Sequence, residues 1–256
     1  MIDLTVADDV AEIVLNAPAK RNALDEAALH ELDIAYADAE QAGVRALLLR
    51  GEGPSFCAGR DISHVDPTTD DVPGYLDGLL APLMRRMAAF PAPTFAAAQG
   101  ACVGVGLGLL IATDVVYVAD TAKIGSPFAA LGATLDSGGH ALFMERLGAH
   151  RTLDLIYTGR LLSGEEAVAA GLFSRVYPVD EVRDAAANAA RQAALGATAA
   201  FLASKRLVAR MRHERLNLWD TFAAETAAQT ALAATDDYRE GFAAFQQKRT
   251  PQFHGR

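Results

Sequence analysis

The chain has 256 residues, of which 51% are hydrophobic, and a formal net charge of −9 at pH 7. This length suits one large α/β domain or a domain with an appendage, and the negative charge argues against nucleic-acid binding, which draws on extended basic surface. No apolar run approaches the roughly 20 residues of a membrane span, and the acidic N-terminus is too weakly apolar for a secretory signal, so we expect a cytoplasmic protein without membrane partners.

The first half of the sequence predicts strands that alternate with helices. Continuous apolar runs are typical of strands buried on both faces of a parallel sheet, and helical spacing of apolar residues separates them. The order of these elements predicts βαβ units. The predicted elements are two short strands joined by a turn at 7–10, a helix opened by Asp25 and ending near Gln41, strands at 45–51 and 93–100 with a helix at 76–90 between them, a short helix at 108–114 and a strand at 115–119.

From Ser137 onward the pattern becomes mainly helical, and glycines separate the helices. Asp237 with Glu240 three residues later has the pattern of a capping box that opens the last helix. The predicted division is an α/β core at 1–195 and a helical region at 196–256. The predicted helices lie at 138–147, 149–157, 163–170, 180–195, 198–213, 217–234 and 237–248.

Two cysteines, Cys57 and Cys102, lie far apart in the sequence among small and apolar residues. They have neither the spacing of metal ligands nor the C-x-x-C pattern of redox sites. We therefore interpret them as small buried thiols, and we expect no metal site.

Three glycine-rich or small-residue stretches stand out: "SFCAGRDI" at 55–62, "QGACVGVGLGLLIATD" at 99–114 and "IGSPFAALGATLDSGG" at 124–139. Small residues at strand ends let backbone N–H groups approach a ligand, although tight helix–sheet packing explains them as well. The middle stretch does not match the dinucleotide pattern G-x-G-x-x-G, because its glycines are Gly104, Gly106 and Gly108 and the third position is Leu109. A dinucleotide site is therefore not expected.

Together the three stretches resemble the crotonase superfamily, also called the enoyl-CoA hydratase/isomerase family. The resemblance extends from "NAPAKRNAL" near the start through "YTGRLLSGEEAVAAGLFSRV" at 157–176 to "EGFAAFQQKRTPQF" near the end. It implies an α/β fold with a repeated ββα spiral core that holds an acyl-CoA site, and a C-terminal helical region used to form a homotrimer or a dimer of trimers. It also implies acyl-CoA thioester substrates, with coenzyme A entering only as part of the substrate.

Members of this family hold the thioester oxygen with two backbone N–H groups, which stabilise an enolate. The motif match implies that these donors belong to Arg60 and Val105, and each such donor lowers the barrier by about 3–4 kcal/mol. Most relatives have glycine or alanine at the second position. Val105 is bulkier, which raises the question of how wide an acyl group the site admits.

Coenzyme A is polyanionic, so a chain of net charge −9 must offer it a local basic cluster. An ordinary solvated surface explains each of the basic residues equally well, including Arg249. The resemblance places these residues around the nucleotide and pantetheine: Lys20, Arg21, Cys57, Ala58, Asp61, Ile62, Gly104, Phe245 and Lys248. Of these, Phe245 and Lys248 would come from a neighbouring subunit.

The hydratases of the family use two glutamates to hold and polarise one water. At the matching positions this chain has Gly108 and, in "SPF", Phe128. Neither residue can accept or donate a proton. Hydration by the usual mechanism is therefore not expected.

Asp136 is then the remaining acid–base candidate, in a "GATLDSGG" loop similar to that of family isomerases, which include a ring-epoxide isomerase and the Δ3,Δ2-enoyl-CoA isomerases. A departure is Thr134, where relatives often have proline. The alternative is that Asp136 caps a helix that begins at Ser137. Apolar neighbours would desolvate a catalytic Asp136 and raise its pKa; these are Phe128, Leu131, Leu135 and Phe143.

Two histidines lie near these motifs, His64 and His140, and both are interpreted as structural. The alternative for His140, four residues after Asp136, is contact with that carboxylate or with the substrate. The leading hypothesis is an enoyl-CoA double-bond isomerase with Asp136 as its single proton carrier. Three alternatives stay open: a hydratase, a non-catalytic acyl-CoA-binding protein, and an enzyme that uses Asp136 as a nucleophile.

Overall fold

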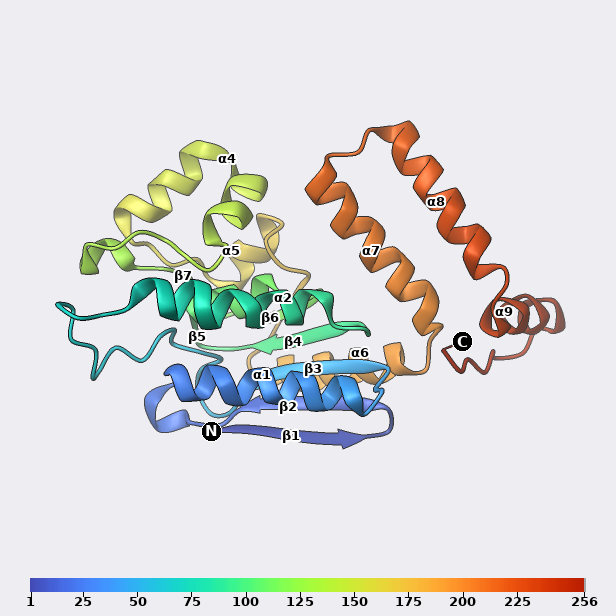
Figure 1. The fold of residues 1–256 in the computed structure, drawn as a ribbon, viewed down its shortest axis with the longest axis horizontal. Coiled ribbons are helices and arrows are strands. Elements are labelled where there is room, and N and C mark those ends of the chain that lie inside the picture. Colours follow the sequence, from blue (N-terminus) through green and yellow to red (C-terminus); the bar gives the residue numbers. More distant parts are fainter. Residues whose placement is uncertain (256) are drawn as a thin grey trace.

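The computed structural model describes residues 1–255, and its centre is a six-stranded sheet in the order β1-β2-β3-β4-β6-β8 (Figure 1). β1 is antiparallel to β2, and all other neighbours in this sheet are parallel. Every residue of β3 and β4 is buried, which confirms the prediction of strands covered on both faces. The strands are β1 (Ile2–Ala7), β2 (Val10–Leu15), β3 (Ala46–Gly51), β4 (Thr94–Ala98), β6 (Val115–Ala119) and β8 (Arg175–Tyr177).

A second, smaller layer of extended chain accompanies this sheet. β5 (Ala101–Val103) pairs in parallel with β7 (Lys123–Gly125), and an isolated bridge between Cys57 and Cys102 adds a further segment to it. The chain therefore passes from a long strand to a short strand and then to a helix, as in β4, β5 and α3 (Val105–Ile111). This is the repeated ββα arrangement, and the three-residue strands β5 and β7 are too short to show a period in the sequence.

Helices cover the sheet, and their ends follow local chemistry. Asp25 accepts a hydrogen bond from the N–H of Ala28 and so opens α1 (Glu26–Gln41), as predicted. The helix predicted at 76–90 is two elements, a π-helical η2 (Gly74–Leu80) and α2 (Ala81–Ala89), because Pro82 has no N–H to continue one regular helix. α6 (Val182–Ala194) packs against β3, β4 and β6 with buried alanines.

The bounds of α3 and α4 differ from the prediction. α3 begins at Val105 instead of Gly108, because Gly104 (φ 55°) makes the turn directly before it. α4 (Gly139–Thr158) joins the two helices predicted at 138–147 and 149–157, and the backbone of Gly148 (φ 74°) breaks it where that boundary was expected. The remaining short helices are η1 (Pro18–Lys20), η3 (Phe128–Leu131) and α5 (Gly164–Ala169).

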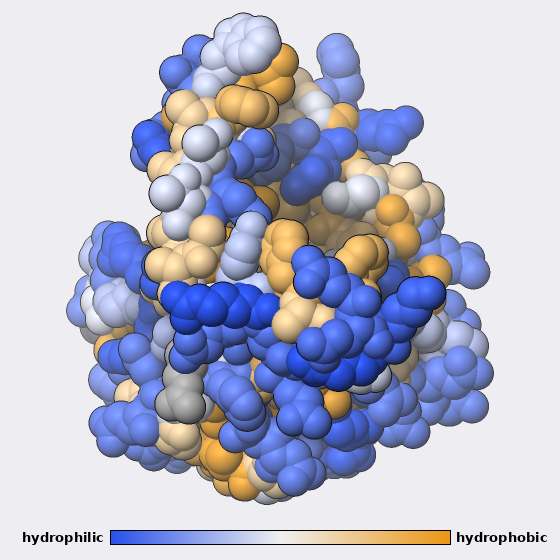
Figure 2. All heavy atoms as spheres, turned by 90° about the vertical axis from the view of Figure 1, so that its right-hand side faces the viewer, coloured by the Kyte–Doolittle hydropathy of each residue, from blue (hydrophilic) through white to orange (hydrophobic). Residues whose placement is uncertain are grey.

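The last three helices, α7 (Thr198–Glu214), α8 (Leu218–Leu232) and α9 (Asp236–Gln247), lie to one side of the sheet (Figure 1). Figure 2 shows this side of the molecule, where apolar side chains surround a hollow. The predicted capping box is wrong: Thr235 caps α9 through the N–H of Tyr238, while the buried Asp237 accepts from the N–H groups of His254 and Gly255. Asp237 thus holds the C-terminal segment against α9.

Within residues 1–255, no helix combines the length and the apolar character needed to cross a membrane. The cytoplasmic location stays a prediction. The division into residues 1–195 and 196–256 also stays a prediction. Residue 256 lies outside the described range.

Candidate active site

Two glycine turns bring the segment after β3 against the start of α3. Gly59 has φ 95°, and a Cβ placed on it would lie 3.0 Å from the carbonyl oxygen of Val103 and 3.7 Å from the nitrogen of Val105. Gly104 has φ 55°, and a Cβ there would lie at an ordinary contact distance, 3.7 Å, from the Cα of Gly59. The close approach at Gly59 and the positive φ at both glycines therefore bring the backbones before Arg60 and Val105 together.

The backbone N–H groups of Arg60 and Val105 donate no hydrogen bond to any group of residues 1–255. Their neighbours are paired: the N–H of Asp61 donates to Leu24 (2.9 Å) and that of Gly104 to Gly125 (3.2 Å). Unpaired donors are uncommon in folded chains, where backbone groups are almost always satisfied. These two N–H groups are thus available to an oxygen atom of a ligand, as an oxyanion hole requires.

The side chain of Val105 is buried in the hydrophobic core. Its extra bulk is therefore accommodated by core packing. Phe128 lies closer to the hole, because a Cβ on Gly104 would come within 3.0 Å of the Cζ atom of its ring. An aromatic ring, instead of a carboxylate, borders the hole on this side.

Asp136 lies in the loop between η3 and α4, and its side chain does not cap that helix. The N-cap residue of α4 is Gly138, which makes no side-chain capping bond. The only hydrogen bond to the Asp136 carboxylate from residues 1–255 comes from the hydroxyl of Ser137, at 2.6 Å. The capping alternative is therefore wrong, and the carboxylate is free for another role.

Burial raises the pKa of Asp136 above its ordinary value, as predicted. The Ser137 hydrogen bond and the charges of Arg60 and His140 act in the opposite direction but do not cancel the effect of burial. One predicted neighbour is wrong: Leu131 is 63% exposed and cannot desolvate the carboxylate, whereas Leu135 and Phe143 belong to the core. A partly buried carboxylate with a raised pKa is suited to general base catalysis.

The side chain of Arg60 makes a cluster that the sequence did not indicate. Its Nη1 and Nη2 atoms donate to the two carboxylate oxygens of Asp70 at 2.9 and 2.7 Å, and its Cζ lies 4.0 Å from the centre of the Tyr75 ring. Tyr75 in turn donates from its hydroxyl to the carbonyl of Leu24 at 3.3 Å. The positive charge of the guanidinium partly opposes the rise that burial causes in the pKa of Asp136. No local pattern marks Asp70, which lies in an irregular loop.

The two positions that carry glutamates in hydratases have no acid. Gly108 faces the Asp136 loop so closely that a Cβ on it would lie 2.6 Å from the Cβ of Ser137. The loop occupies the place into which a side chain at 108 would project. Of Gly108, Phe128 and Asp136, only Asp136 has a side chain that can accept or donate a proton.

The residues implied to bind coenzyme A divide into two groups. Those near Arg60 are brought together: the N–H of Ala58 donates to the carbonyl of Arg21 at 2.9 Å, and Asp61 accepts from the Lys20 ammonium at 3.1 Å. Lys20 also pairs with Asp25 at 3.1 Å, so two carboxylates already share its charge. Arg21 and Ile62 are exposed.

Cys57 and Cys102 are both fully buried free thiols, as predicted. Burial raises the pKa of the Cys57 thiol to about 12. Only its backbone is therefore suited to contact a ligand.

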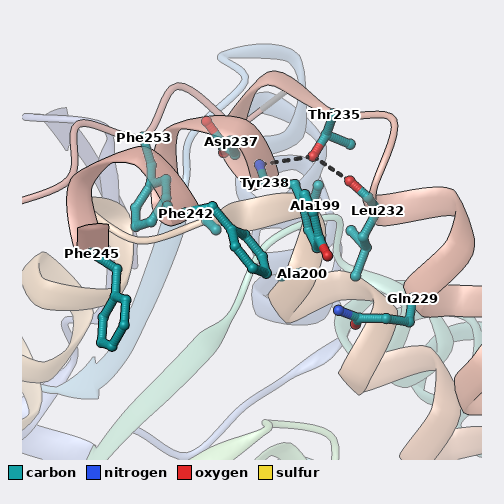
Figure 3. A pocket seen from close by; sticks show the side chains of 12 residues that line it. Ala199, Ala200, Gln229, Leu232, Thr235, Asp237, Tyr238, Phe242, Phe245 and Phe253 are labelled. Atoms are coloured by element: carbon teal, nitrogen blue, oxygen red, sulfur yellow. Dashed lines mark hydrogen bonds between the residues drawn. The ribbon is translucent and has the colours of Figure 1, made fainter. Parts of the chain in front are cut away.

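The second group does not join the first within one chain. Phe245 and Lys248 lie on and directly after α9, at the other end of the molecule from α4 (Figure 1). Phe245 is 85% exposed. Phe245 borders a separate, mainly apolar cavity of about 440 Å³ between α7, α8 and α9, in which Phe242, Phe245 and Phe253 line one side (Figure 3).

Both histidines near the motifs are exposed, which corrects the expectation of structural histidines. His140 is the second residue of α4 and acts on Asp136 through its charge. His64 lies on the loop after Ile62 and takes no part in the cluster.

Comparison with known proteins identifies the family of this chain. The family model described as enoyl-CoA hydratase/isomerase matches residues 5–256. The 1,2-epoxyphenylacetyl-CoA isomerase of Escherichia coli is 32% identical over 257 residues (98% of this chain and 97% of that protein), and the 2,3-dehydroadipyl-CoA hydratase of the same organism is 32% identical over 245 residues (95% and 94%). A solved enoyl-CoA hydratase from Bacillus anthracis superposes with a TM-score of 0.89 at 28% identity, covering 100% of this chain and 99% of that one.

The chain belongs to the enoyl-CoA hydratase/isomerase family and has the crotonase fold. It is an acyl-CoA enzyme of that family. Several of the similar proteins are named hydratases, and the 1,2-epoxyphenylacetyl-CoA isomerase of Escherichia coli is named an isomerase.

Proposed function

We propose that this enzyme is an enoyl-CoA double-bond isomerase in which Asp136 carries the proton. The observation that supports it is the combination of one partly buried carboxylate, with a pKa raised by burial, and two unpaired N–H groups, while Gly108 and Phe128 stand where the water-binding glutamates would be. A double-bond shift needs one base and one oxyanion hole. It consumes no water.

The chemistry proceeds in two proton transfers. The Asp136 carboxylate removes a proton from C2 of a 3-enoyl-CoA, and the electron pair moves into the thioester, whose oxygen accepts hydrogen bonds from the N–H groups of Arg60 and Val105. The same proton then returns to C4 of the dienolate. The C=C bond moves from C3 to C2, and the carboxylate is regenerated.

Substrate binding is proposed along the family pattern. Arg21, Lys20 and the backbone of residues 57–62 would hold the nucleotide and pantetheine of one subunit's substrate. Phe245 and Lys248 would reach that substrate from a neighbouring subunit of a homotrimer or a dimer of trimers, which accords with the exposure of Phe245.

The test is conversion of a 3-enoyl-CoA to the conjugated 2-enoyl-CoA by wild type and by Asp136→Asn. We expect Asp136→Asn to abolish conversion while acyl-CoA binding, measured by calorimetry, is retained. Asp154→Asn is a matched control, since Asp154 is an exposed aspartate on the far part of α4. Unchanged turnover in Asp136→Asn would contradict the proposal.

A hydratase is the second candidate, because several of the similar proteins carry that name. Formation of a 3-hydroxyacyl-CoA from a 2-enoyl-CoA at a rate that exceeds isomerisation would favour it. Tight acyl-CoA binding without exchange of the C2 proton in heavy water would instead indicate a non-catalytic binding protein. A trapped acyl adduct on Asp136 would indicate nucleophilic catalysis.

A further inference from the structure

Ser137 has a backbone conformation that its residue type disfavours. Its φ is 53°, in the left-handed region that glycine adopts freely and that a residue with a Cβ adopts only at an energetic cost. The two residues that follow it are glycines, so the loop does not lack glycine where the chain needs freedom. A serine kept in this conformation indicates that its side chain contributes something that glycine would not.

The contribution is a short hydrogen bond. The hydroxyl of Ser137 donates to Oδ1 of Asp136 at 2.6 Å, a length typical of a hydroxyl on an ionised carboxylate. Because this is the only hydrogen bond that the carboxylate accepts from residues 1–255, it determines which oxygen is occupied. Oδ2 is left to accept a proton.

Gly108 makes room for this arrangement. A Cβ at position 108 would lie 2.6 Å from the Cβ and 3.1 Å from the carbonyl oxygen of Ser137, so any side chain there would displace the backbone of the loop. The residue that removes the hydratase acid is therefore also the residue that allows Ser137 to reach Asp136.

The other charged and titratable groups that face Asp136 do not provide this contact. Arg60 is occupied by its two bonds to Asp70, Tyr75 donates to Leu24, and His140 is exposed on α4. Arg60 and His140 act on the carboxylate through space only. Among residues 1–255, only Ser137 makes a hydrogen bond that orients the carboxylate.

We propose that Ser137 is a positioning residue, which holds Oδ1 of Asp136 and presents Oδ2 to the substrate, and that Gly108 is required for that contact. The proposal deepens the isomerase function proposed above and rests on it for its catalytic consequence. The hydrogen bond itself can be tested without turnover.

The experiment compares Ser137→Ala, Ser137→Gly and Gly108→Ala with wild type. Protein labelled with ¹³C in the aspartate carboxyl groups is titrated by NMR, and the Asp136 signal is assigned by its loss in Asp136→Asn. We expect the Asp136 midpoint to rise by up to about one pH unit in both Ser137 variants, because a hydrogen bond to the carboxylate favours its ionised form. Gly108→Ala should move it in the same direction.

Exchange of the C2 proton of an acyl-CoA in heavy water gives the second readout. We expect kcat to fall roughly 10-fold in the Ser137 variants with little change in KM, since misplacement of a reacting group costs rate. The acidic limb of the pH profile of kcat should move to higher pH, because the Asp136 midpoint rises. Ser204→Ala, an exposed serine-to-alanine change on α7, is the matched control and should leave both readouts at wild-type values.

The outcomes separate the two proposals. An unchanged Asp136 midpoint in Ser137→Ala and Ser137→Gly overturns the role of the hydroxyl, and so does a shift in Ser137→Ala that Ser137→Gly does not share. If wild type shows no exchange but the midpoint rises in both variants, the contact stands and the isomerase function fails. Thermal unfolding of each variant shows that the fold is retained.

Discussion

Residues 1–195 and residues 196–255 use apolar side chains in opposite ways. In the first region β3 and β4 are buried at every position and belong to one continuous core. In the second, the buried residues of α7 and α8 are Thr198 and Thr221, while Trp219 is 75% and Phe222 62% exposed. Exposed apolar surface of this kind marks an interaction site. The first region thus completes its own fold, whereas the second has an apolar surface that we expect another subunit to cover.

Polar anchors connect the two regions. Lys205 on α7 pairs with Asp114 at 2.9 Å and donates to the carbonyl of Phe90 at 3.0 Å. Arg45, before β3, donates to the carbonyl oxygens of Gly196 and Phe253 at 2.5 and 3.0 Å. The helical region is therefore held at its base, while the faces of α7 and α8 stay exposed.

The largest expected effect is a loss of turnover when Asp136, in the first region, is replaced. Asp136→Asn should lower isomerase turnover by about 10²- to 10⁴-fold, the usual contribution of a general base. Burial raises the pKa of Asp136 above its unfolded value, so the ionised form costs stability at neutral pH, and the variant should be more stable than wild type. Kinetics and chemical denaturation measure the two effects, and the oligomeric mass should not change.

The next effect tests whether the second region needs a partner. The double variant Trp219→Asp, Phe222→Asp should weaken subunit association by about 2–4 kcal/mol for each anchor and lower the mass found by sedimentation. Ile34→Asp is the matched control, because Ile34 is a 58% exposed apolar residue of α1 in the first region. A wild-type protein that sediments as a monomer would contradict the comparison.

A smaller effect concerns the anchors between the regions. Lys205→Met should cost about 1–3 kcal/mol of unfolding free energy, because the carbonyl oxygens of Phe90 and Ala92 and the Asp114 carboxylate lose their donor. Arg206→Met, at an exposed neighbouring position on α7, provides the control. Equal stability of the two variants would show that α7 is held by other contacts.

The smallest effect is a pH dependence of the stability of the C-terminal segment. Two bonds from the Arg249 guanidinium and one from the N–H of Gln252 lower the pKa of Glu240 to about 2. Its stabilising contribution is therefore present above its unfolded pKa, near 4.5, and is lost as pH falls toward 2. As pH falls from about 4.5 toward 2, proteolysis of the C-terminal segment should increase in wild type. Glu240→Gln should show increased cleavage already at neutral pH. Glu225→Gln, on the exposed face of α8, should behave as wild type.

Much of the fold was predictable because it depends on local pattern. Continuous apolar runs predicted β3, β4 and β6, and helical spacing with glycine separators predicted the helices that follow Ser137. The three-residue strands β5, β7 and β8 were missed, since such short segments owe their conformation to neighbouring strands. Asp237 was misassigned because its partners, His254 and Gly255, are distant in sequence.

The candidate site divides in the same way. The sequence by itself determined which residue types are present: an aspartate at 136, no acid at 108 or 128, and glycines where two backbone N–H groups become accessible. Tertiary structure alone decided that the Asp136 carboxylate is bound by Ser137 instead of capping α4, that Gly108 admits that serine, and that Asp70 and Tyr75 hold Arg60. The physical reason is that a residue's chemistry and backbone freedom are local properties, whereas its hydrogen-bond partner and its desolvation depend on segments that only packing brings together.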